Sequence, residues 1–228
     1  MKKLVMSLLM AMVVAFPFFA DATIIGDVTL ADYPSEPAGY ISRDSGANWG
    51  SYYLDYDVQI SGGALSQAFC AELNADGPQG TLTYTLLTID NGLGAFGLNA
   101  TDYLAAAWIA QNYFNQDDNY LAGAQIAIWE ILTDGANDLN GGTFRSNNAY
   151  NTYATTILNA LANQNLVDSD TWALAVNPTV GVGGQINVAY AQNYLVQYNR
   201  PPQVPEPASL LLFGLGLLGL AGIRRKMK

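Results

Sequence analysis

Two residues have side chains and settings that could do chemistry, Cys70 and Gln125. Cys70 is the single cysteine among 228 residues, so it cannot form an internal disulfide. In an exported chain, an unpaired cysteine is buried, paired with another chain, or used chemically. Gln125 lies on the apolar stripe of an expected helix, where an amide without hydrogen-bond partners costs about 1–3 kcal/mol. Taken singly, each residue favours a structural role, as a small buried side chain and as an amide bonded to nearby backbone.

The neighbours of these two residues form short motifs. Phe69 precedes Cys70 in a Phe-Cys-x-Glu-Leu segment, and Gln125 begins a Gln-x-x-Ile-Trp segment that ends at Trp129. Both motifs resemble those of the thioester domains on Gram-positive surface adhesins, in which the cysteine and glutamine side chains join with loss of ammonia. The resemblance implies a Cys70–Gln125 thioester, which would acylate an amine or hydroxyl of a target and leave a covalent attachment.

The residue types around the pair suit this chemistry. A thiolate can attack an amide carbonyl when folding holds the two in contact, where effective molarities of about 10⁵ M become available. We expect Phe69, Trp108 and Trp129 to shield the product from water. Residues 23–203 contain no lysine, and an amine-reactive domain should avoid lysines of its own. The chain also contains no histidine, so the sequence identifies no group that would activate Cys70 or the incoming nucleophile.

The N-terminus has the pattern of a secretory signal peptide. Lys2 and Lys3 precede an apolar run over residues 4–19, and Ala20 and Ala22 form a small-x-small cleavage site. We therefore expect a signal helix over residues 1–22, with the secretion machinery and signal peptidase as partners. Cleavage after Ala22 leaves an exported domain with a short C-terminal spacer, residues 23–203.

The C-terminus carries a second targeting pattern. An extended tetrapeptide, Val204-Pro205-Glu206-Pro207, runs into an apolar segment over residues 208–223 and then a basic cluster that begins with Arg224 and Arg225. This order resembles the PEP-CTERM sorting signal of Gram-negative bacteria, over residues 204–228. The resemblance implies a membrane helix, processing by an exosortase-like membrane protease, and an envelope rich in exopolysaccharide. Basic residues stay on the cytoplasmic side. We expect transient anchoring in the inner membrane, followed by release to the cell surface or extracellular matrix.

The exported part is strongly acidic. It carries three arginines against seventeen aspartates and glutamates, a formal charge of −14. Such a surface has no basic footprint for nucleic acid. The absence of histidine removes the usual general base and most zinc sites. Neither acidic stretch, 72–77 or 134–142, has the full spacing of a calcium loop. We assign no catalytic residue, metal or cofactor and expect no enzyme.

The periodicity of the middle predicts an α+β domain, an antiparallel sheet with about three helices packed on one side. Alternating runs predict strands, and residues 32–50 are expected to form a loop. Apolar residues at helical spacing predict helices, the first with Thr101 as its N-cap. The expected strands cover residues 23–30, 52–60, 81–89, 172–176 and 186–198, and the expected helices cover residues 102–115, 118–132 and 147–163.

Two functions follow from these patterns. The first is a structural or adhesive protein of the cell envelope or exopolysaccharide matrix, in its sharper form a covalent adhesin that uses Cys70 and Gln125. Its partner would be exopolysaccharide or a nucleophile on a surface. The alternative is a non-covalent carbohydrate-binding or carbohydrate-active matrix protein, because tyrosine side chains can stack on sugars. The target, the fate after tail processing, the oligomeric state and calcium binding stay open.

Overall fold

The computed structural model describes residues 24–42, 49–73, 81–135, 137–177 and 192–198. The chain divides into two compact units, residues 1–198 and 199–228, and every described residue belongs to the first. The expected signal helix and the C-terminal membrane helix lie outside the described residues. Within the described ranges, no helix has both the length and the apolar character needed to cross a membrane.

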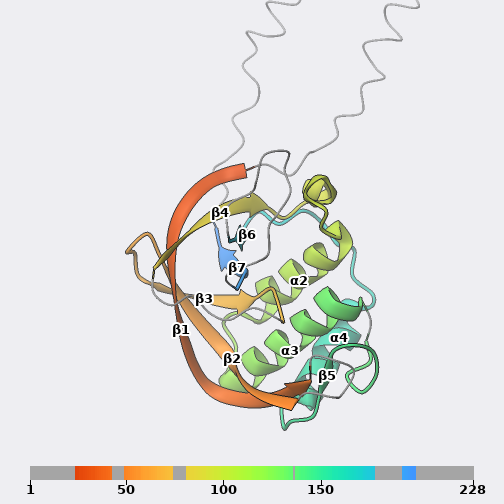
Figure 1. Ribbon diagram of the computed structural model, residues 1–228. Coiled ribbons are helices and arrows are strands. Elements are labelled where there is room, and N and C mark those ends of the chain that lie inside the picture. Colours follow the sequence, from red (N-terminus) through yellow and green to blue (C-terminus); the bar gives the residue numbers. More distant parts are fainter. Residues whose placement is uncertain (1–23, 43–48, 74–80, 136, 178–191, 199–228) are drawn as a thin grey trace, which may run out of the picture. The chain divides into compact units, whose positions relative to one another are not determined.

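An antiparallel sheet that closes on itself forms one half of the described unit (Figure 1). Its strand order is β2-β3-β7-β6-β4-β1-β5, and β1 also pairs with β2, which completes a ring of six strands. Closure leaves few free sheet edges, and the two-residue β5 pairs with β1 outside the ring. The strands are β1 Ile24–Ser42, β2 Trp49–Ile60, β3 Leu65–Cys70, β4 Leu82–Thr88, β5 Arg145–Ser146, β6 Trp172–Val176 and β7 Tyr194–Gln197.

The prediction of a loop over residues 32–50 is wrong for most of that range. β1 continues to Ser42 because β2 supplies hydrogen-bonding partners along its length, up to the pair Ser42↔Trp49. The prolines that suggested a loop lie at or beside a register shift between Ser35 and Ala38, a position where a strand tolerates proline. Gly39 permits a close approach there, since a Cβ atom would stand 2.5 Å from Cδ1 of Leu54.

The three predicted helices are present, with somewhat different ends. They are α2 Ala100–Tyr113, α3 Asp118–Asp134 and α4 Asn151–Leu161, and a 3₁₀ helix η1 covers Asn91–Phe96. The side chain of Asn99, rather than that of Thr101, caps α2 by accepting a hydrogen bond from the Thr101 N–H. Asp117 caps α3 through two main-chain N–H groups, and Gly135 ends it in the left-handed conformation, with φ of 63°.

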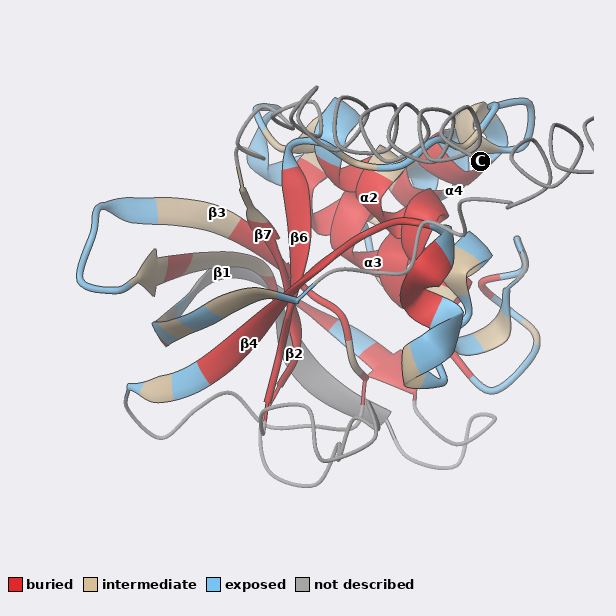
Figure 2. Cartoon of the chain, turned by 90° about the horizontal axis from the view of Figure 1, so that it is seen from above, coloured by how far each residue is buried: buried red, intermediate tan, exposed pale blue. Residues whose placement is uncertain are grey.

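Helix α3 is the central element of the helical half. Figure 2 shows the helices gathered on one side of the barrel, with α3 buried along most of its length. It packs against α2, α4, β2 and β3. Gly123 allows α4 to come close, because a Cβ atom there would stand 2.6 Å from the Cβ of Tyr153. The described unit is therefore α+β as expected, and its sheet closes into a barrel beside the helices.

Candidate functional site

The structure brings Cys70 and Gln125 together. The main-chain N–H of Cys70 donates to Oε1 of Gln125 at 2.7 Å, and Nε2 of Gln125 donates to the main-chain oxygen of Cys70 at 2.9 Å. Both residues are buried, with 1% and 0% of their surface exposed. The glutamine amide is thus clamped by the backbone of the residue that carries the only thiol of the chain.

The end of a strand pair explains why this clamp exists. β2 pairs with β3 only as far as Tyr56↔Ala68, and the register would place Leu54 opposite Cys70. On the other side, β3 continues to pair with β7 through Cys70↔Tyr194. The side-chain amide of Gln125 therefore bonds the last residue of β3 where β2 has already diverged. A carboxamide suits this position because it offers one acceptor and one donor, as a peptide group does.

Two of the three expected shielding residues lie around the clamp. Phe69 is buried and its ring packs against that of Trp172, with centroids 5.7 Å apart. Trp129, one helical turn after Gln125, is also buried, and its indole N–H donates to the main-chain oxygen of Glu72 at 3.2 Å. Both aromatic residues come from the elements that hold Cys70 and Gln125, and their role as a shield against water stays a prediction.

The third expected shielding residue, Trp108, lies in a different set of contacts. Its half-buried ring packs against Tyr113 at 6.2 Å between centroids. Tyr113 stacks on Tyr120 at 6.0 Å, and Tyr120 meets Tyr153 at 4.9 Å. These four half-buried rings, from α2, α3 and α4, form a row that we call the aromatic row. A role for Trp108 as a shield of Cys70 stays a prediction.

Sequence reasoning gave no role at this site to Glu72, which follows Cys70 by two residues. Its Oε1 accepts a hydrogen bond from Nδ2 of Asn193 at 2.7 Å, and its main-chain oxygen accepts one from Nε2 of Gln192 at 2.6 Å. Burial raises the pKa of the Glu72 carboxyl to about 7, although the hydrogen bonds from Asn193 lower it. The one signal in the sequence was the acidic position of the Phe-Cys-x-Glu motif.

The remaining positions considered in the sequence are the acidic stretches and the targeting signals. Among the described ranges, no three acidic or cysteine side chains gather closely enough to hold a metal ion. Asp134, from the second acidic stretch, instead accepts hydrogen bonds from the N–H groups of Thr143 and Phe144, which fixes the loop after α3. The signal-cleavage residues and the sorting signal, Ala20, Ala22, Val204, Pro205, Glu206, Pro207, Arg224 and Arg225, lie outside the described residues.

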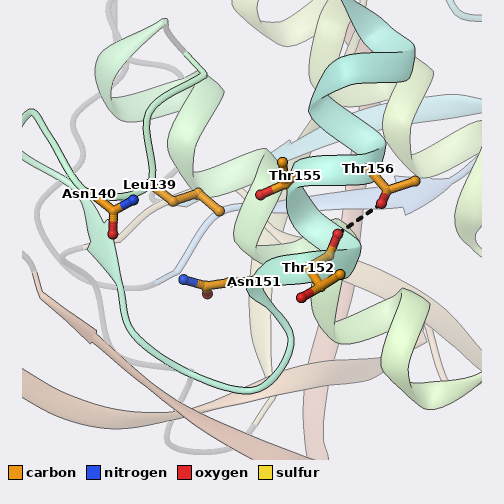
Figure 3. A pocket seen from close by; sticks show the side chains of 6 residues that line it. All are labelled: Leu139, Asn140, Asn151, Thr152, Thr155 and Thr156. Carbon is orange, nitrogen blue, oxygen red and sulfur yellow. Dashed lines mark hydrogen bonds between the residues drawn. The ribbon is translucent and has the colours of Figure 1, made fainter.

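An open hollow of about 340 Å³ lies between α4 and the loop before β5 (Figure 3). Its polar lining is neutral, and none of the lining residues titrates near neutral pH. It therefore has no group for acid–base chemistry, and it contains neither Cys70 nor Gln125. The lining residues are Leu139, Asn140, Asn151, Thr152, Thr155 and Thr156.

Two parts of the chain match known families. Residues 67–165 match the family described as the thioester domain, over a range that includes both Cys70 and Gln125. The resemblance seen in the two motifs is confirmed. Residues 203–226 match the PEP-CTERM protein-sorting motif. A PEP-CTERM motif implies processing by exosortase-type machinery. Together, the two matches indicate an exported surface protein with an adhesin-like thioester domain.

Solved structures of thioester domains show a loose similarity to the chain. The N-terminal domain of the Streptococcus pyogenes pilus tip adhesin Cpa is 16% identical, with a TM-score of 0.42 over 75% of this chain and 99% of that one. The N-terminal thioester domain of the fibronectin-binding protein SfbI from Streptococcus pyogenes is also 16% identical, with a TM-score of 0.39 over 75% and 98% of the two chains. No curated protein matches the sequence significantly.

Proposed function

We propose that this protein is a covalent adhesin of the cell surface or extracellular matrix, in which Cys70 and Gln125 form an internal thioester. The observation that supports it most directly is the pair of hydrogen bonds between the Gln125 amide and the Cys70 backbone, at 2.7 and 2.9 Å. They fix the amide beside the residue that carries the thiol, which is the arrangement that gives an intramolecular reaction its high effective molarity.

The clamp also supplies electrostatic help for bond formation. When the Cys70 sulfur attacks Cδ of Gln125, negative charge develops on Oε1. The Cys70 N–H already donates to that oxygen and stabilises the charge without reorganisation, as an oxyanion hole does. The new S–C bond forms, the C–N bond breaks, and Nε2 leaves as ammonia.

The stored bond is then transferred to a target. An amine or hydroxyl attacks the same carbonyl carbon, the C–S bond breaks, and the Cys70 thiol is restored while the target becomes joined to Gln125. Each molecule reacts once, because the glutamine is consumed. We therefore propose an attachment protein and no enzyme.

Export and sorting supply the setting for this attachment. The sorting motif supports processing by an exosortase-like membrane protease, after which the domain would remain at the cell surface or in an exopolysaccharide matrix. The lack of lysine between residues 23 and 203 supports an amine-reactive domain, since the domain then carries no lysine amine of its own that could consume the bond.

Intact mass and thiol alkylation of the purified protein test the proposal. We expect a mass lower by one ammonia than the processed sequence requires, and no alkylation of Cys70 under native conditions. Treatment with a small amine should add the mass of that amine and expose the thiol. Cys70→Ala is the matched control, because it should show the full mass and no adduct. Free alkylation of the folded wild-type protein at full mass would refute the thioester.

The aromatic row favours a second candidate, reversible binding of a neutral glycan. Its four half-buried rings, Trp108, Tyr113, Tyr120 and Tyr153, cross three helices, and stacking on sugars needs ring faces rather than charge. Retention on a neutral polysaccharide gel tests this function. Loss of retention in Tyr113→Ala, with Cys70→Ala retained as strongly as the wild type, would support the lectin-like function. Loss of retention in Cys70→Ala, with Tyr113→Ala retained as strongly as the wild type, would favour the covalent function.

A further inference from the structure

A carboxylate two residues after Cys70 is held in place by two other elements. Trp129 on α3 and Gln192 before β7 both donate to the main-chain oxygen of Glu72, at 3.2 and 2.6 Å. Asn193 donates to the carboxylate itself at 2.7 Å. The position of the Glu72 carboxylate is therefore set by the surrounding fold.

The same elements hold the reactive pair. Trp129 follows Gln125 by one turn of α3, and the N–H of Ala71 donates to the main-chain oxygen of Asn193 at 2.8 Å. Asn193 is itself anchored, because its Oδ1 accepts from the N–H of Asn177 at 2.8 Å. α3 and the chain entering β7 thus fix one short segment, residues 70–72, that carries both the thiol and the carboxylate.

Chain geometry keeps the two residues close. Glu72 follows Cys70 by two residues, so their Cα atoms lie at most about 7 Å apart. Among the described residues, the buried glutamate Glu130 instead accepts a hydrogen bond from the N–H of Asp138 in the loop after α3. Glu72 is thus the glutamate whose own segment, residues 70–72, is held by the elements that hold Cys70 and Gln125.

We propose that Glu72 is the proton acceptor of the Cys70–Gln125 site. The inference rests on the thioester proposed above. In bond formation, the carboxylate takes the thiol proton as the S–C bond forms and passes it to Nε2, which leaves as ammonia. In transfer, it takes a proton from the attacking amine or hydroxyl and passes it to the Cys70 sulfur as the C–S bond breaks. Glu72 ends each step in its starting state.

The environment of Glu72 suits this role near neutral pH. Burial raises its pKa to about 7, so both protonation states are populated where the protein works. Tyr103 on α2 interacts electrostatically with Glu72, and burial raises the pKa of Tyr103, which therefore stays protonated and neutral. The charge of Asp102 acts on Tyr103, and the groups that α3 and the start of β7 present to Glu72 are neutral.

The test is the pH dependence of the reaction of the purified protein with methylamine, followed by mass. In the wild type, the rate should rise steeply with pH below about 7, because the amine and Glu72 both lose protons there. Above pH about 7 the rate should rise less steeply, because only the amine is still being deprotonated. Glu72→Gln keeps an oxygen for Asn193 and removes the titration. We expect a rate lower by about 100-fold or more and no change of slope near pH 7. Glu130→Gln is the matched control and should react like the wild type.

Each outcome decides a separate question. A wild-type protein without the ammonia loss refutes the thioester itself. A thioester that reacts with the same pH profile in Glu72→Gln and the wild type overturns the role of Glu72. If Glu72→Gln never forms the bond, recovery of the bond in Glu72→Asp supports the role. Equal failure of both variants together with lost folding stability would show a structural role only and overturn the proposal.

Discussion

Helix α3 buries two polar side chains five residues apart, and their environments differ sharply. Gln125 has both ends of its amide bonded to Cys70. Glu130 has one oxygen bonded to the N–H of Asp138, while Oε2 finds no partner among the described residues. Both side chains are fully buried. An amide that is bonded at both ends is held in one geometry. A buried carboxyl with one unbonded oxygen instead destabilises the fold by an amount that depends on its charge.

The largest effect should come from replacing Gln125, whose amide is bonded at both ends. Gln125→Ala leaves the N–H and C=O of Cys70 without these two partners inside the core. We expect the free energy of unfolding to fall by about 2–5 kcal/mol, together with complete loss of the mass signature of the thioester. Urea unfolding and intact mass measure the two effects. An alanine variant with wild-type stability would contradict the structural importance of the clamp.

The stability contributed by Glu130 should change with pH in the opposite sense to that of a salt-bridged acid. Burial raises the pKa of Glu130 from 4.5 to about 7, so the folded state favours the protonated form. The stability that this form contributes is present below pH 4.5 and is lost as pH rises through about 7. Glu130→Gln cannot lose a proton and should be more stable than the wild type at pH 8, on the order of 2–3 kcal/mol.

The measurement is the urea midpoint of both proteins at pH 5 and pH 8. The advantage of Glu130→Gln should be much smaller at pH 5, where the wild-type carboxyl is mostly protonated in the fold. Asp134 and Asp138 add like charge near Glu130, so higher salt should reduce the difference at pH 8. An advantage that does not change with pH would show that the charge of Glu130 is not its cause.

The smallest effect should come from replacing Trp129, which lies between Gln125 and Glu130 on α3. Trp129→Phe keeps a buried ring and removes the hydrogen bond to the main-chain oxygen of Glu72. We expect a loss of about 1 kcal/mol and a modest rise in the rate at which amines consume the thioester, since water gains access to residues 70–72. Unfolding in urea and the half-life of the ammonia-loss species measure these changes. An unaltered half-life would show that the Trp129 indole does not shield the thioester.

Much of the helical half could be predicted from the sequence. The stripe from Leu121 to Leu132 and the acidic N-cap Asp117 are local signals, and they fixed α3 to within a few residues. The strand β1 was half missed, because its later part is stabilised by pairing with β2 rather than by its own residues. Prolines and glycines there gave the local pattern of a loop.

The candidate site divides in the same way. Cys70 and Gln125 could be chosen because their types are unusual in their places, and the motifs resemble thioester domains. The Phe-Cys-x-Glu motif contains Glu72, but no local pattern shows which of the seventeen acidic residues between positions 23 and 203 has a partly buried carboxyl. The environment of Glu72 comes from Asn193, 121 positions along the chain.

The sequence by itself determined the sorting motif at the C-terminus, the acidic and lysine-free character of residues 23–203, and the three helices. These depend on composition or on residues within a few positions of one another. Only the tertiary structure decided that the sheet closes, that Gln125 bonds the backbone of Cys70 across 55 positions, and that burial raises the pKa of Glu72. Pairing and desolvation are set by whatever the fold brings alongside, and that information is not local to any stretch of the chain.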